Sequence, residues 1–316
     1  MFQNKNMDID LVYLWVDGSD PKWRAKHNAC IGKTEEKSVE NCEGRFADND
    51  ELKYSLRSVE KYAPWIHRVF IVTDGQVPKW LNTSGTRVRV VDHREIMPEC
   101  CLPCFNSALI EHFLWKIPGL SESFLYANDD MFINRPLSPD FFFADDGLPI
   151  IRLVHSRLRD FFLAFKEKLL GIPLKYYVRT IRNSSRLVAK AYGVCYNGKP
   201  HHNIDAYLKG DYQHMEDLFK TEIGETLGNH VRSENDIQRS LYAYVAMAEK
   251  RCHPVYVDRK TSFRFHIQNM KHYKMLEEYN PMLFCMNDSE YATDDDRRKV
   301  TEFLKQRFPD KSEFEK

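Results

Sequence analysis

The chain has 316 residues, of which 43% are hydrophobic and 29% are charged, and its 46 basic residues balance 46 acidic ones. This length is enough for one large α/β domain with a substantial hydrophobic core. A net charge of zero excludes the overall basic field on which many nucleic-acid binders depend, so we expect no nucleic-acid partner.

Membrane and secretion signals are also lacking. The sequence contains no run of about 18 apolar residues, and residues 1–8 lack the apolar core of a signal peptide. We therefore expect a cytoplasmic protein with reduced cysteines. Cys101 and Cys104 form a CxxC pair, but the second pair of a structural zinc site is missing, so zinc is not expected.

The first third of the chain alternates between predicted strands and helices. The apolar run 9–16 (IDLVYLWV) predicts a buried strand, and the turn 17–21 ends it. Residues 24–47 are polar and predicted to be irregular. A helix is expected from about Glu51 to Pro64, because apolar residues recur there at helical spacing. Two more strands are predicted, at 68–73 and 87–91.

The pattern continues along the chain. We predict a helix over 107–116, a strand over 124–127, a helix over about 236–249 with Ser233 as its N-cap, and a strand over 263–267. A last helix runs to about Phe308. Strands that alternate with helices on this scale indicate an α/β fold with a mostly parallel sheet covered on both faces.

Segment 152–190 differs in charge, with ten basic residues against only Asp160 and Glu167. Its aromatic and leucine residues predict two amphipathic helices, broken at 171–173. We interpret the segment as a basic helical insertion, and two readings of its charge stay open. One is a helical hairpin whose charges are simply solvated, as is usual for charge runs. The other is a surface that contacts an anionic polymer or the inner face of the membrane.

Carboxylates follow three of the predicted strands: Asp17 after the first, Asp74 after the second, and Asp129 with Asp130 after the strand at 124–127. Because the ends of parallel strands meet at one edge of a sheet, these groups are expected to lie together. Oxygen ligands suit Mg²⁺ bound with phosphate groups. Asn128-Asp129-Asp130 is also a common turn composition, and for Asp74 the turn is the favoured interpretation.

Two later residues are candidates for catalysis. His202 is followed three residues later by Asp205, which could orient its ring. Arg232 precedes a predicted helix N-terminus, where a phosphate would meet a guanidinium and backbone N–H groups. For both residues, an exposed side chain with no special role is the alternative.

Long stretches of the chain carry a resemblance to a known family. The most particular are IDLVYLWVDGSD at 9–20, the run from Asp48 to Asn82, and FLYANDDMFINRPLSPDFFF at 124–143, followed by PHHNID at 200–205, VRSENDIQ at 231–238 and FCMND at 284–288. These resemble the four regions of the Stealth proteins, the hexose-1-phosphate transferases of bacterial capsule synthesis, which are related to the GlcNAc-1-phosphotransferase acting on lysosomal enzymes. Ala108-Leu109 and Trp115 depart from the family pattern, where His-Ala and His are usual.

The resemblance implies a Rossmann-like core similar to the A-type glycosyltransferases, a UDP-sugar donor, a saccharide acceptor, and dependence on Mg²⁺ or Mn²⁺. It implies a nucleotide-sugar half at 1–151, the basic insertion at 152–199, and the rest of the core at 200–316. The site residues it implies are Asp129 and Asp130 for the metal, Asp17, Asn128 and Arg57 at the donor, His202 at the acceptor hydroxyl, and Arg232 on the phosphate.

The implied reaction is transfer of a sugar-1-phosphate to an acceptor hydroxyl, with release of UMP, in capsular or cell-surface polysaccharide synthesis. His202 is the expected general base and Asp17 the alternative. A metal-dependent glycosyltransferase that releases UDP would use the same sheet and the same acidic site. A third hypothesis is that the protein has no catalytic activity and binds a sugar or a lipid.

Overall fold

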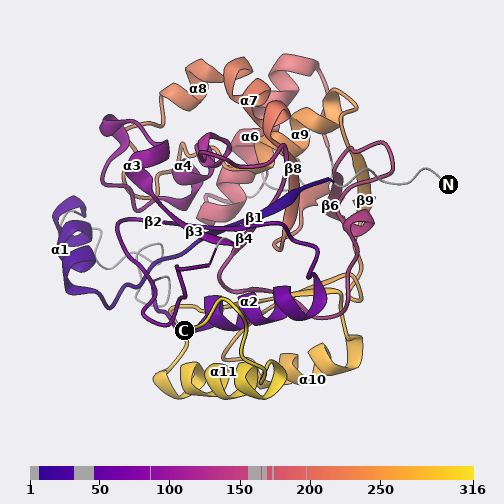
Figure 1. The fold of residues 1–316 in the computed structure, drawn as a ribbon. Coiled ribbons are helices and arrows are strands. Elements are labelled where there is room, and N and C mark those ends of the chain that lie inside the picture. The colour runs from indigo at the N-terminus through magenta and orange to yellow at the C-terminus, as the bar shows by residue number, and fades with distance from the viewer. Residues whose placement is uncertain are drawn as a thin grey trace.

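The computed structural model of the protein describes residues 7–31, 46–85, 87–155, 165, 169–172, 174–196 and 198–316. Its central five-stranded sheet has the order β3-β2-β1-β4-β8 (Figure 1). The first four of these strands pair in parallel and β8 is antiparallel to β4, which confirms the predicted mostly parallel sheet. The strands are β1 (Ile9–Leu14), β2 (Val69–Thr73), β3 (Val88–Asp92), β4 (Ser123–Asn128) and β8 (Asp205–Leu208).

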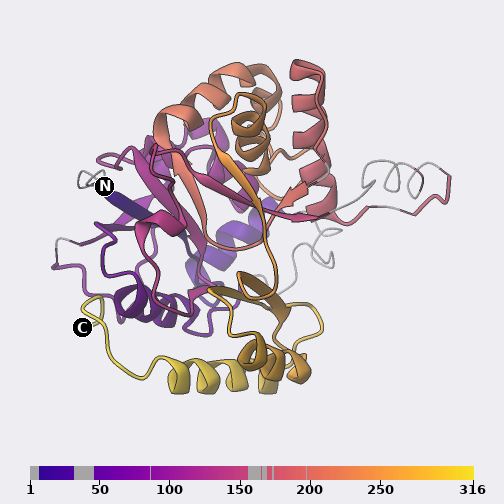
Figure 2. The same ribbon diagram turned by 90° about the vertical axis from the view of Figure 1, so that its right-hand side faces the viewer.

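Helices cover both faces of this sheet, as the continuous apolar runs of β1 and β2 require. Side chains that alternate along β1 enter two different cores: Val12 packs on one face, and Leu11 and Tyr13 pack on the other. In Figures 1 and 2 one layer lies above the sheet and another below it. The upper layer holds α3 (His93–Ile96), α4 (Ser107–Glu111), α6 (Tyr176–Tyr192), α7 (Lys209–Leu218), α8 (Lys220–Gly224) and α9 (Ser240–Ala248), and the lower holds α2 (Glu51–Tyr62), α10 (Met270–Tyr279) and α11 (Asp294–Arg307).

Two smaller sheets flank the main one. One has the order β10-β11-β5 and the other β7-β6-β9. The strands are β5 (Met131–Ile133), β6 (Ile150–His155), β7 (Gly198–Pro200), β9 (His253–Tyr256), β10 (Ser262–His266) and β11 (Leu283–Asn287), and three short 3₁₀ turns are η3 (Glu99–Cys101), η4 (Leu114–Lys116) and η5 (Pro139–Phe141). The β4–β5 turn therefore joins the main sheet to the first of the small sheets at Asp129 and Asp130.

Helix α2 illustrates how the apolar spacing anchors the sheet. Leu52, Leu56 and Val59 are completely buried, and each contributes about 1.5–3 kcal/mol through removal of its side chain from water. On the same face, Ser55 exchanges a 2.7 Å hydrogen bond with the Tyr13 hydroxyl. The helix ends at Tyr62, just before Pro64, as the sequence predicts.

Three sequence expectations are wrong in detail. Part of the segment expected to be irregular forms α1 (Pro21–Cys30), because Asp20 caps it and Pro21 occupies its first position. The remainder, 32–45, lies outside the described residues. The expected helix at 107–116 is two short helical pieces, α4 and η4. The expected helix at 236–249 begins only at Ser240, so Ser233 does not cap it.

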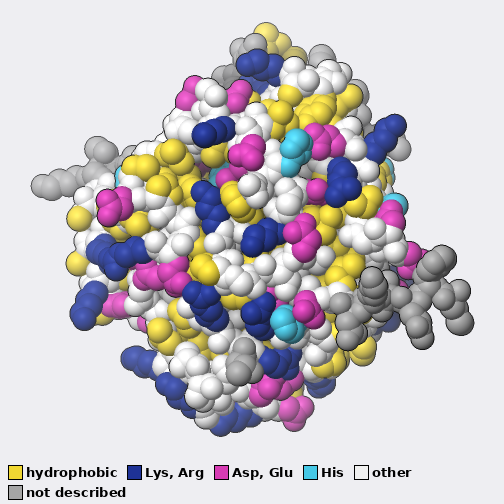
Figure 3. Space-filling view, turned by 45° about the horizontal axis from the view of Figure 1, so that its top comes forward, with side chains coloured by type: hydrophobic (Ala, Val, Ile, Leu, Met, Phe, Trp, Pro, Cys, Tyr) yellow, Lys and Arg dark blue, Asp and Glu magenta, His cyan; other side chains and the backbone are white. Residues whose placement is uncertain are grey.

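The basic segment only partly faces solvent. Residues 156–164, 166–168 and 173, with most of the first expected helix, lie outside the described residues. The second expected helix is α6. Arg152 and Arg182 are buried, with 4% of each exposed, so neither can meet a membrane or a polymer. Arg152 instead covers the Phe141 ring at 3.6 Å. On the face shown in Figure 3, basic and acidic side chains are interspersed.

Within the ranges that the structure describes, no helix combines the length and the apolar character needed to cross a bilayer.

Candidate active site

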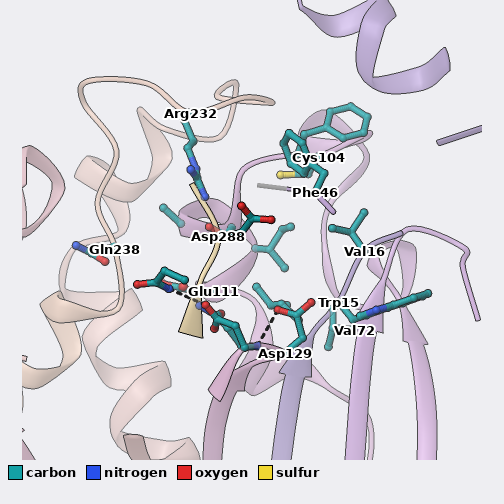
Figure 4. A pocket seen from close by; sticks show the side chains of 18 of the residues that line it. Trp15, Val16, Phe46, Val72, Cys104, Glu111, Asp129, Arg232, Gln238 and Asp288 are labelled. Atoms are coloured by element: carbon teal, nitrogen blue, oxygen red, sulfur yellow. Dashed lines mark hydrogen bonds between the residues drawn. The ribbon is translucent and has the colours of Figure 1, made fainter. Parts of the chain in front are cut away.

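A pocket of about 270 Å³ opens at the carboxyl ends of the four parallel strands (Figure 4). Residues that follow each strand line it: Trp15 and Val16 after β1, Asp74 after β2, His93 after β3, and Asp129 with Asp130 after β4. The facing wall comes from α6, from the loop before α9, and from the loop after β7. The predicted position of the site, at the edge where parallel strands end, is the position of this pocket.

The strand-end carboxylates form the floor of the pocket. Burial, followed by the charges of Asp130, Glu51 and Asp48, raises the pKa of Asp129 well above its ordinary value. Burial also raises the pKa of Glu51 to about 8 and that of Asp48 to about 6. Several carboxylates in one place therefore repel one another, and a bound cation would relieve that repulsion.

Asp130 is held in place by the small sheet beside it. Its Oδ2 accepts a 2.6 Å hydrogen bond from the Asn287 side chain and lies 3.4 Å from Cys285 Sγ, while its buried Oδ1 has no hydrogen-bond partner among the described residues. Asp288, the next residue after β11, also lines the pocket. The expected metal residues Asp129 and Asp130 are thus brought together, whereas the carboxylate of Asp288 is paired with Arg297, whose Nε lies 2.8 Å from its Oδ2.

This donor set fits a divalent cation that is shared with a substrate. Within the described ranges, no group of three or more His, Cys, Asp or Glu side chains is arranged to hold a metal ion by itself. Mg²⁺ commonly takes one or two carboxylates, with phosphate oxygens and water completing its shell. The crowded carboxylates and the unpartnered Asp130 Oδ1 are consistent with that arrangement.

Arg232 enters from the opposite wall. Figure 4 shows it extending from the loop before α9 into the pocket, toward Asp288. The loop is shaped by Asp236, whose carboxylate accepts hydrogen bonds from the Asn106 amide at 2.9 Å, the Tyr176 hydroxyl at 2.6 Å and the Ser233 N–H at 2.9 Å. Asp236 therefore fixes the loop in place, and this is why the predicted helix does not start there.

His202 lies in the same wall, in T-shaped contact with the Tyr177 ring at 5.5 Å. Burial, followed by the positive charges of Arg264 and Arg239, lowers its pKa well below the ordinary value, so the imidazole is neutral. Asp205 does not orient this ring, contrary to the expectation. Its Oδ1 lies 2.9 Å from Nε2 of the neighbouring His201, and its Oδ2 lies 2.5 Å from Arg239.

Two buried residues of the pocket were not found from sequence. Glu111, from α4, accepts a 3.1 Å hydrogen bond from the Tyr126 hydroxyl, and burial raises its pKa. The same hydroxyl oxygen lies 2.7 Å from Asn128 Oδ1, so the Tyr126 proton is shared between the two acceptors. Arg239 is 7% exposed and lies over the Tyr126 ring at 5.1 Å. The only available signal was a charged residue within each apolar pattern, which resembles an ordinary helix surface.

Two expected donor residues are not brought to the pocket. Asp17 does not line it, because its Oδ1 accepts the Ser19 N–H at 2.8 Å and the Ser19 hydroxyl at 2.6 Å. Arg57 lies on α2, away from the pocket, and its guanidinium forms a two-pronged pair with Glu315, at 2.8 Å for each contact. Arg57 is therefore paired away from the pocket, whereas the role of Asp17, whose charge also acts on Asp48, stays a prediction.

Asp74 and the CxxC cysteines were not expected to belong to the active site, and the structure places them as follows. Asp74 lines the pocket and forms an ion pair with Lys26, so it is more than a turn residue. Cys101 and Cys104 are buried thiols, and burial raises the pKa of Cys104 to about 12.

Comparison with known proteins places this pocket in a family. Residues 7–35 match conserved region 1 of the Stealth proteins, and residues 45–151 match their conserved region 2. Among solved structures, a galactosyltransferase, LgtC, solved with donor and acceptor sugar analogs, aligns over 95% of both chains with 12% identity and a TM-score of 0.48.

Curated relatives align over nearly the whole chain. It is 34% identical to the exopolysaccharide phosphotransferase cps2G of Lactiplantibacillus plantarum, over 100% of this chain and 98% of that protein. It is 33% identical to the capsular polysaccharide phosphotransferase fcs1 of Haemophilus influenzae, over 90% and 79%. Against the Streptomyces coelicolor exopolysaccharide phosphotransferase SCO2592 the identity is 35%, but the chain spans only 33% of that protein. The chain therefore belongs to the Stealth family of phosphotransferases.

Proposed function

We propose that the protein transfers a sugar-1-phosphate from a UDP-sugar to a hydroxyl of a saccharide acceptor, forms a phosphodiester and releases UMP, in the synthesis of a cell-surface polysaccharide. The observation that carries this proposal is that one pocket combines crowded carboxylates at the strand ends with Arg232 and a neutral His202 on the facing wall. The names of the relatives agree with it.

The reaction makes and breaks bonds at phosphorus. The acceptor oxygen attacks the β-phosphorus of the donor, and the bond from that phosphorus to the bridging oxygen breaks, so that UMP leaves with the bridging oxygen. The bond from the sugar carbon to its phosphate is untouched. The proton of the acceptor hydroxyl passes to the neutral imidazole of His202, a step that is worth about 10²–10⁴-fold in rate.

Charge stabilisation is the second requirement. Negative charge spreads over the phosphoryl oxygens during transfer, and a fixed guanidinium at Arg232 would stabilise it. Asp129 and Asp130 would hold Mg²⁺ or Mn²⁺, which would supply further positive charge to the diphosphate when bound. Glu111 has a positioning role: it contacts the Tyr126 hydroxyl, which in turn contacts the Asn128 side chain.

The nucleotide product tests the proposal. The purified protein is incubated with a panel of UDP-sugars and candidate acceptors, and nucleotides are separated by chromatography. We expect UMP, one new ³¹P phosphodiester signal per transfer, and delivery of a β-phosphorus label to the acceptor. Accumulation of UDP, with the label still on the nucleotide, would instead establish the glycosyltransferase that releases UDP.

A further inference from the structure

One face of β10 lies beside the proposed active site and is not used by the mechanism above. Along β10, Phe263 and Phe265 enter a buried core, whereas Ser262, Arg264 and His266 occupy the other face. In the paired strand, Cys285 lies opposite Arg264, and Asn287 lies opposite His266. Ser262, Arg264 and His266 therefore form a polar row on β10, whereas Leu283 and Cys285 of the paired strand are completely buried.

Contacts at both sides of this face place Arg264 between the two halves of the pocket. Ser262 Oγ lies 3.0 Å from Nδ1 of His201 and accepts a 3.3 Å hydrogen bond from Asn203, so the face abuts the loop that carries His202. Cys285 and Asn287 both reach Asp130 Oδ2. Arg264 thus lies at the rim, between His202 and Asp130, and is not among the residues that line the pocket.

Arg264 is available to a ligand. It is exposed, and within the described part of the chain it makes no hydrogen bond and no ion pair. Arg264 also acts on Asp130 through its charge, but Asp130 Oδ2 accepts a hydrogen bond from Asn287 and the unpartnered Oδ1 is assigned above to the proposed metal. Lys199 is a second cation near His202: it lies 5.7 Å from the centre of the Tyr177 ring, which itself contacts His202.

A neutral hydroxyl does not explain why Arg264 and Lys199 both lie near His202, the residue that would accept its proton. Cations near an imidazole oppose its protonation, so this arrangement weakens the base unless an anion binds there. A donor diphosphate would already meet Arg232 and the metal inside the pocket. An anion that meets Arg264 at the rim therefore belongs to the acceptor side.

We infer that Arg264, supported by Lys199, is an anion-binding site for the acceptor and holds a phosphodiester already attached to the sugar whose hydroxyl is attacked. This inference rests on the proposed function and refines its substrate class. The protein then prefers to extend a chain that already contains phosphodiesters over starting one on a neutral saccharide. A guanidinium suits this task because it presents paired donors to two phosphate oxygens.

The test compares two acceptors that differ only in the anion. One is the methyl glycoside of the accepted sugar, and the other carries a methyl phosphodiester at the same anomeric carbon. For the wild-type protein we expect a KM about tenfold lower for the phosphodiester, the effect of one charge-assisted contact. Arg264→Ala should remove that difference, and Arg264→Lys should restore part of it. KM for the UDP-sugar should change less than about twofold.

Arg259→Ala is the matched control. Arg259 is an exposed arginine just before β10, and its Nη1 donates to the Tyr279 hydroxyl at 2.6 Å. This variant should keep the preference for the phosphodiester. Equal KM changes for both acceptors in Arg264→Ala, or a raised donor KM, would overturn the inference.

Calorimetric titration of each acceptor into the protein without donor gives a readout that needs no turnover. Arg264→Ala should weaken binding of the phosphodiester acceptor about tenfold and leave that of the methyl glycoside unchanged. Unselective binding by the wild-type protein contradicts the anion site. Selective binding together with release of UDP in the assay contradicts the proposed reaction and leaves the anion site supported.

Discussion

The main charged neighbours of Asp129 are other carboxylates, whereas those of His202 are cations. Each group is therefore pushed toward its neutral form, the first by a raised pKa and the second by a lowered one. The two ends of the pocket are prepared for opposite ligands, a cation at the strand ends and an anion at the facing wall. A metal-bound diphosphate that meets an anionic acceptor would satisfy both.

The largest effect is expected at the acidic end. Asp129→Asn should lower the transfer rate by about 10³-fold or more, because the cation loses a ligand that neutralises it. Removal of the repulsion from Asp130, Glu51 and Asp48 should leave the melting temperature unchanged or raise it. Kinetic assays and thermal melts measure both, and EDTA should reversibly produce the same loss. Asp140→Asn, at an exposed position, is the control. Full activity in EDTA would rule out the metal.

At the facing wall, substitution of two adjacent histidines, His201 and His202, should distinguish a structural role from a catalytic one. His202→Ala should lower kcat by about 10²-fold or more, with donor affinity nearly unchanged and stability preserved. His201→Ala should instead destabilise the fold by about 1–3 kcal/mol, because Asp205 and Ser262 lose a buried partner. Stopped-time assays and urea unfolding of both variants provide the comparison. Loss of stability without loss of kcat in His202→Ala would show that the ring is structural.

The smallest expected effect is on stability, to which Glu51 at the acidic end and His202 at the facing wall should contribute with opposite pH dependence. Glu51, with its pKa raised from 4.5 to about 8, adds stability that is complete below pH 4.5 and is lost as pH rises through 8. His202, with its pKa lowered from 6.5, adds stability that is complete above pH 6.5 and is lost as pH falls through its folded pKa.

Urea unfolding in EDTA from pH 4.5 to 8 measures the two contributions. Relative to wild type, Glu51→Gln should make the slope of unfolding free energy against pH more positive, by up to about 1.4 kcal/mol per pH unit. His202→Gln should make the slope below pH 6.5 less positive. If unfolding free energy changed with pH identically in all three proteins, the opposite pKa shifts of Glu51 and His202 would be contradicted.

The parallel core and the acidic edge were predictable, because apolar runs followed by Asp or Asn carry a local signal for both. Asp74, Asp129 and Asp130 follow directly from where the strands end. His202 and Arg232 were named with help from the family resemblance, and the structure places both at the same pocket. Their catalytic roles stay a prediction, as does the division of the chain into three parts.

What sequence could not predict depends on long-range contacts. Asp205 turns toward His201 and not His202 where Arg239, the residue just before α9, pairs with its other oxygen. From sequence Arg57 is an unpaired cation on α2, but in the structure it forms an ion pair with Glu315, 258 residues away in sequence. From sequence Asp17 is a candidate ligand, but in the structure its Oδ1 accepts hydrogen bonds from Ser19 in the following turn. Local patterns cannot supply such partners.

The pairing of β4 with β8 also constrains how the chain is made. β4 and its parallel neighbours come from the first 128 residues, but the strand that covers the outer edge of β4 is residues 205–208. During synthesis that edge, which is almost entirely buried in the finished protein, stays unpaired while the intervening segment is translated. An exposed apolar edge invites strand addition from another chain. The nascent protein should therefore be most prone to aggregate when synthesis is slowed between β4 and β8.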